Sequence, residues 1–102
     1  MIVEVVGGAD QRPEVRVVEV EELSRVVLAL GEVTDAEADE ALQAAGLGRL
    51  EGADTALLEV AALRAAAGAP AGEWVQRWEE LVARDAPDGG RLRVRVEGAA
   101  GA

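Results

Sequence analysis

The acidic segment DAEADE holds the densest group of possible metal ligands in the chain. Asp35, Glu37 and Asp39 have the spacing of the first, third and fifth positions of a calcium-binding loop. The rest of that pattern is missing, because Glu40 replaces the glycine of the sixth position and Gly46 replaces the bidentate glutamate of the twelfth. Acids at the start of a helix interact favourably with its dipole. The segment therefore predicts a helix start, and we expect no metal site.

The hydroxyl groups of Ser24, Thr34 and Thr55 are the possible nucleophiles. A hydroxyl needs an adjacent base to attack, yet histidine, lysine, cysteine and tyrosine are all absent. Histidine and cysteine are also preferred ligands of zinc, haem iron and iron–sulfur clusters. Carboxylates are plentiful, which leaves a paired-carboxylate mechanism open, although no spacing singles out a pair. The sequence therefore predicts a non-catalytic protein without a cofactor.

Trp74 and Trp78 are the only aromatic residues of the chain. Side chains four residues apart lie on the same face of a helix, so the two indole rings can stack. They could fill the core. Because tryptophan is seldom wholly buried and its N–H needs a partner, they could also line an apolar ligand pocket or form the centre of a protein interface.

Arg91, Arg93 and Arg95 alternate with apolar residues in RLRVRVE, which is the most regular strand pattern in the chain. Alternation places the three guanidinium groups on the solvent-facing side of a strand. This row is a candidate surface for an acidic partner, or else it is neutralised within the sheet by acids of the N-terminal strands. Those acids are Glu4, Glu14 and Glu19.

The net charge of −10 limits the possible partners. It repels phosphate backbones, so we expect no direct nucleic-acid binding and favour basic partners. No apolar run approaches the roughly 18 residues of a membrane span, and no basic leader precedes the first apolar segment. We expect a soluble, cytoplasmic, bacterial protein whose residues 1–97 form one domain, followed by a disordered tail at 98–102.

Two valine-rich segments, residues 1–6 and 14–20, predict a hairpin with a loop of about seven residues. Gly7 and Gly8 belong to that loop, because the phosphate-loop pattern around them is incomplete. Adjacent Val17 and Val18 interrupt the alternation and indicate a bulge or burial on both faces. The third predicted strand is residues 91–97.

Helical periodicity and end signals predict the remaining elements. The segment 54–67 has apolar residues on every face of the helix that it would form, so it is expected to be the buried central helix. Asp54 is its expected N-cap, and Gly68 is expected to end it. Residues 21–30 are assigned to a short helix, with a single helix over 14–30 as the alternative. Thr34 and Glu37 form a capping box for a helix that ends at Gly46. An amphipathic helix begins at Glu73.

The expected architecture is α+β: a small, mainly antiparallel sheet of three strands, two N-terminal and one C-terminal, with about four helices packed on one face. For function, we expect a non-catalytic protein that associates with itself as a homodimer or with a protein partner. The alternatives are a small-molecule-binding protein with an apolar pocket at Trp74 and Trp78, and an acidic inhibitor that occupies a basic site.

Overall fold

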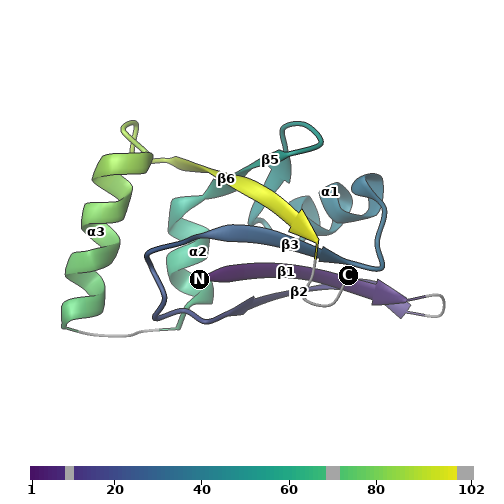
Figure 1. The fold of residues 1–102 in the computed structure, drawn as a ribbon, viewed down its shortest axis with the longest axis horizontal. Helices are drawn as coiled ribbons and strands as arrows, with labels where there is room; N and C mark the ends of the chain where they lie inside the picture. The colour runs from purple at the N-terminus through teal and green to yellow at the C-terminus, as the bar shows by residue number, and fades with distance from the viewer. Residues whose placement is uncertain (9–10, 69–71, 99–102) are drawn as a thin grey trace.

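The computed structural model describes residues 1–8, 11–68 and 72–98, in which a mixed six-stranded sheet is joined by three helices (Figure 1). The strand order is β2-β1-β3-β6-β5-β4. The β1–β3 and β3–β6 pairs are parallel, and the other three are antiparallel. The prediction of three strands and four helices is therefore wrong. The elements are β1 (Ile2–Gly8), β2 (Gln11–Val18), β3 (Val27–Gly31), α1 (Asp35–Ala44), β4 (Gly48–Leu50), β5 (Thr55–Glu59), α2 (Val60–Ala66), α3 (Glu73–Asp85) and β6 (Arg91–Gly98).

The N-terminal hairpin is present as predicted, but its strands are longer. Antiparallel pairing runs from Ile2 opposite Val18 to Gly8 opposite Gln11, so the predicted seven-residue loop is wrong. The register shifts between Val6 and Gly8, whereas Val17 and Val18 pair regularly. Over this step β1 advances by two residues and β2 by three, so the extra residue lies in β2 between Gln11 and Glu14 and not at the valine pair.

Residues 21–30 do not form the predicted helix. Their second half belongs to β3, which lies between β1 and β6 at the centre of the sheet. Val27, Leu28 and Ala29 are all buried, although consecutive side chains of a strand point to opposite faces. A strand buried on both faces has a continuous apolar run, which resembles one face of a helix in sequence. This ambiguity explains the wrong assignment.

Helix α1 confirms the predicted capping box. The Thr34 hydroxyl accepts from the Glu37 N–H at 3.1 Å, and the Glu37 carboxylate accepts from the Thr34 N–H at 2.9 Å. Gly46, with φ of +73°, ends the helix, and the Leu47 N–H donates back to the Leu42 carbonyl at 3.0 Å. Leu42 and Leu47 are both buried in the core, so the helix end is fixed by an apolar contact as well.

The predicted central helix is in fact a strand followed by a short helix. Residues 55–59 form β5, in which Ala56 and Leu58 are buried and the other three residues are half-buried. Only the following seven residues are helical, and Leu63 is the one buried residue of α2. Asp54 is not an N-cap, and its carbonyl accepts from the Val96 N–H of β6 at 2.8 Å. Pairing with β6 and β4 on either side outweighs the helix propensity of alanine and leucine here.

Helix α3 and strand β6 confirm the predicted amphipathic helix and alternating strand. Trp74, Trp78 and Leu81 of α3 are buried, as are Leu92 and Val94 of β6. Arg84 pairs with Asp85, and Arg77 donates to the Glu21 carbonyl. Residues 99–102 of the predicted tail lie outside the described residues, while Gly98 ends β6.

The two faces of the sheet differ in character. The inner face joins the helices in one apolar cluster that includes Val3, Leu28, Leu58 and Trp78. The outer face carries the charged side chains of alternate positions. In Figure 1, α3 lies at one end of the sheet and α1 near the other. Among the described residues, no helix is long and apolar enough to cross a membrane.

Candidate functional site

The structure places both tryptophans in the core between α3 and the sheet. The rings stack with centroids 5.5 Å apart and planes inclined by 7°. The Trp74 Nε1–H donates to the Val20 carbonyl at 2.6 Å, so its polar group is satisfied. Trp78, only 2% exposed, still borders a hollow of about 330 Å³ between α2 and α3. That hollow is mainly apolar, with Val60, Val82, Ala86 and Pro87 among its lining residues.

The arginine row of β6 is exposed, as its alternation predicted, and each member has an acidic neighbour. Arg91 Nε lies 3.3 Å from Glu59 Oε1, and Arg95 Nη1 lies 3.7 Å from Glu97 Oε2. Arg93 donates to both carboxylate oxygens of Glu51, at 2.7 and 2.9 Å. These hydrogen bonds lower the pKa of the Glu51 carboxyl and raise the pKa of Arg93. The row is therefore largely neutralised by residues of β5, of the β4–β5 connection and of β6 itself.

The predicted neutralisation by acids of the N-terminal strands is wrong, because β3 lies between β1 and β6. Glu4 instead faces Arg16 of β2, with a nitrogen–oxygen distance of 3.8 Å. The alternation of β6 correctly predicted that its arginines face solvent. Their acidic neighbours, however, depend on strand order, which the alternation does not reveal.

The turn before β6 is fixed by Asp88. Its carboxylate accepts from the Gly90 N–H at 3.0 Å and from the Arg91 N–H at 3.3 Å. These backbone hydrogen bonds hold the pKa of the Asp88 carboxyl below its ordinary value of 3.8. The charged carboxylate therefore stabilises the start of β6, where Arg91 enters the site.

We expect this turn to contribute to acid unfolding. A carboxyl with a lowered pKa in the folded state adds stability above its unfolded pKa, and that stability is lost as the pH falls through the folded pKa. The loss due to Asp88 should therefore begin below about pH 4. Asp88→Asn keeps an accepting oxygen without the titration and should flatten this acid limb in urea titrations from pH 6 to 3. Asp88→Ala should lower stability across the whole range, and an unchanged limb in Asp88→Asn would contradict the assignment.

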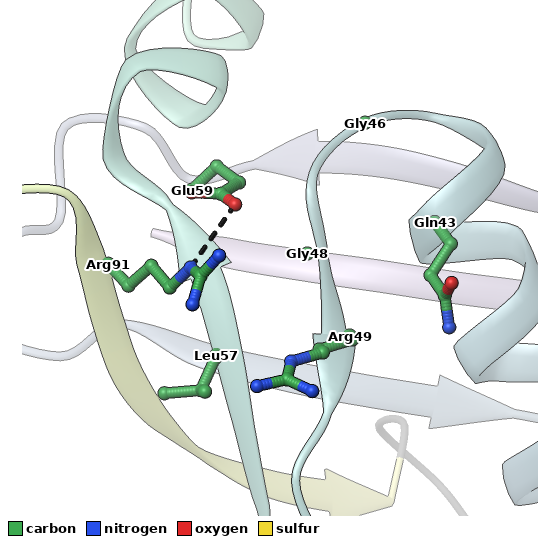
Figure 2. A pocket seen from close by; sticks show the side chains of 7 residues that line it. All are labelled: Gln43, Gly46, Gly48, Arg49, Leu57, Glu59 and Arg91. Atoms are coloured by element: carbon green, nitrogen blue, oxygen red, sulfur yellow. Dashed lines mark hydrogen bonds and ion pairs between the residues drawn. The ribbon is translucent and has the colours of Figure 1, made fainter.

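A second hollow, of about 270 Å³, lies on the outer face where β4, β5 and β6 meet the end of α1 (Figure 2). Arg49 of β4 and Arg91 of β6 extend toward each other across Leu57 of β5. Register explains the convergence, since Arg49 pairs with Leu57 and Arg91 pairs with Glu59, two residues further along β5. The full lining is Gln43, Gly46, Gly48, Arg49, Leu57, Glu59 and Arg91.

The alternation of β6 predicted Arg91, but no sequence pattern assigned residues 48–50 to a strand, so Arg49 was missed. Gly48 was the available signal. Its φ is +150°, and a Cβ there would lie 2.1 Å from the Leu57 carbonyl oxygen, so β4 can approach β5 only with glycine at this position. This close approach positions Arg49 beside Leu57.

Neither a metal site nor a nearby relative defines the chemistry further. Within the described ranges, no group of three or more acidic, histidine or cysteine side chains could hold a metal ion. Comparison of the chain with protein-family models, curated proteins and solved structures finds no significant match. The function must therefore be argued from the surfaces of this molecule.

Proposed function

We propose that this chain is a non-catalytic, cytoplasmic protein that acts by associating with a second copy of itself through strand β2. The observation that supports the proposal is the unequal protection of the two sheet edges. An unpaired edge strand offers a row of backbone donors and acceptors to another chain. Strand β1 lies inside the sheet, between β2 and β3, so the two edges are β2 and β4.

The β4 edge is short and covered. It spans three residues, and the Leu50 N–H donates to Asp39 Oδ1 of α1 at 2.8 Å. The β2 edge spans eight residues and forms the lower border of the sheet in Figure 1. Pro13 lies within β2 near the hairpin, so the stretch free of proline is residues 14–18. This stretch is the available template for pairing.

The charges along β2 favour a second copy as the partner. Glu14 and Arg16 are exposed on the same face, on either side of Val15. In an antiparallel two-fold pairing centred on Val15, Glu14 lies opposite the partner's Arg16, and the same contact recurs on the other side of the axis. Opposite charges directly across strands are favourable by about 0.2–1 kcal/mol per pair.

We expect the protein to dimerise more strongly as salt rises. Two copies that each carry a net charge of −10 repel one another, and salt screens this repulsion. Salt also weakens the few exposed ion pairs across the two-fold axis, but this loss of attraction is smaller than the decrease in repulsion between the two molecules. Sedimentation velocity over a range of protein and salt concentrations measures this, and a monomer under all conditions would contradict the proposal.

Two variants locate the contact. Glu14→Arg and Arg16→Glu each place like charges opposite one another in the homodimer, so each protein alone should remain monomeric. An equimolar mixture restores opposite charges across the axis and should form a heterodimer. Glu79→Arg on α3 makes the same change in net charge as Glu14→Arg but away from β2, and should dimerise like the unmodified protein.

The hollow beside Trp78 supports a second candidate function, the binding of a small apolar molecule between α2 and α3. Its volume of about 330 Å³ lies within the range of ligand pockets, and its lining is mainly apolar. Titration with an anilinonaphthalene sulfonate dye tests this. Saturable dye binding that is lost in Val82→Glu would favour the pocket over association as the primary function.

A further inference from the structure

We propose that the hollow between Arg49 and Arg91 binds a small dicarboxylate, which the two guanidinium groups hold over the Leu57 side chain. A guanidinium group matches a carboxylate with two parallel hydrogen bonds, so two converging arginines suit a ligand with two acidic ends. This ligand is separate from the proposed self-association, because the hollow lies at the β4 side of the sheet and β2 is the opposite edge.

The two arginines keep donor groups that their neighbours do not use. Arg91 contacts Glu59 through Nε, and its terminal amino groups extend into the hollow (Figure 2). In the part of the chain that the structure describes, no carboxylate lies within ion-pair distance of Arg49. By contrast, Arg93 donates from both Nε and a terminal nitrogen to Glu51. The hollow therefore contains guanidinium donors that no carboxylate of the described residues occupies.

The local charge is opposite to that of the whole molecule. Two arginines and Glu59 give the lining a net charge of +1, while the chain carries −10. An isolated positive site on an acidic protein attracts a small anion, whereas a large acidic partner would be repelled by the rest of the surface. This difference favours a free small molecule over an acidic protein as the occupant.

Size and lining define the ligand further. The volume of about 270 Å³ is close to the lower limit for ligand pockets, so the molecule must be small. Leu57 between the two arginines offers an apolar contact to a short carbon chain. β5 alone separates β4 from β6, and the two arginines are offset by two residues along it, so their Cα atoms lie about 12 Å apart. Both side chains extend into this gap, which leaves a shorter distance between the two guanidinium groups (Figure 2). A four-carbon dicarboxylate such as succinate has suitable dimensions.

Isothermal titration calorimetry at low salt with succinate, acetate and inorganic phosphate tests the proposal. Succinate should bind most tightly, and Arg49→Gln or Arg91→Gln should each weaken it by about tenfold or more, because each removes a charge-assisted pair. Arg49→Lys keeps the charge but loses the planar donor pair, so most of the weakening should persist. Thermal melts verify that each variant is folded.

Arg93→Gln is the matched control, with the same loss of charge on the same face of the same strand, outside the hollow. It should change succinate affinity by less than about twofold. Equal weakening by Arg93→Gln and Arg49→Gln would overturn the proposal, since it would show attraction by general charge. Absence of succinate binding would also overturn it, as would tighter binding of phosphate. The monomeric variant Glu14→Arg should bind succinate normally, which separates this result from that for self-association.

Discussion

Replacing Trp78 with alanine should lower the free energy of unfolding by about 3–5 kcal/mol. The side chain is 2% exposed and is the largest fully buried one in the described residues. Its removal leaves a cavity at the junction of α3 with the sheet and takes away the stacking partner of Trp74. Domains of this size are stable by only about 5–15 kcal/mol, so the variant should approach the limit of folding.

Urea unfolding monitored by the fluorescence of Trp74 measures the effect. Glu79→Ala provides the control, because Glu79 is the next residue of the same helix and is exposed. Its effect should stay within about 0.5 kcal/mol. A Trp78→Ala curve that coincides with the control would show that the ring contributes little to the core and is available to a ligand or partner.

Local signals were sufficient for four parts of the fold. Three of them depend only on residues that are close in sequence, within a few helical turns or a single strand. They are the capping box at Thr34, the amphipathic face with Trp74 and Trp78, and the alternation of β6. The hairpin was recognised for the same reason, since its strands are adjacent in sequence. These patterns fix which side of an element faces the core.

Segments whose hydrogen bonds come from distant residues could not be predicted in this way. The stretch 19–26 shows the cause. The Val20 carbonyl accepts from Trp74, the Glu21 carbonyl accepts from Arg77, and the Met1 amino group donates to the carbonyls of Glu22 and Arg25. A helix over 21–30 would satisfy these groups locally, and the tertiary contacts replace it.

The candidate site was predicted only in part for the same reason. Arg91 was identified from the alternation of its own strand, but Arg49 and Glu59 become its neighbours only through the β4–β5–β6 order. That order depends on β5, whose apolar residues also fit a buried helix. Whether a short apolar segment of this kind forms a strand or a helix depends on its pairing partners and not on its own periodicity.

Gly48→Ala should lower the free energy of unfolding by about 2–4 kcal/mol. Two effects add. The φ of +150° is unfavourable for a residue with a Cβ, and that Cβ would lie 2.1 Å from the Leu57 carbonyl oxygen. The oxygen belongs to backbone, so it cannot move aside without separating β4 from β5. Displacement of β4 would also move Arg49 and weaken succinate binding.

Gly46→Ala distinguishes backbone strain from the clash. Gly46 lies two residues earlier with φ of +73°, and a Cβ there would have no atom within 4 Å. It should therefore cost only the left-handed conformation, about 1–2 kcal/mol. Chemical denaturation of both variants gives the difference, which we assign to the contact between β4 and β5. Equal losses would show that β4 can shift without cost, and in that case the strand could not hold Arg49 in place for a ligand.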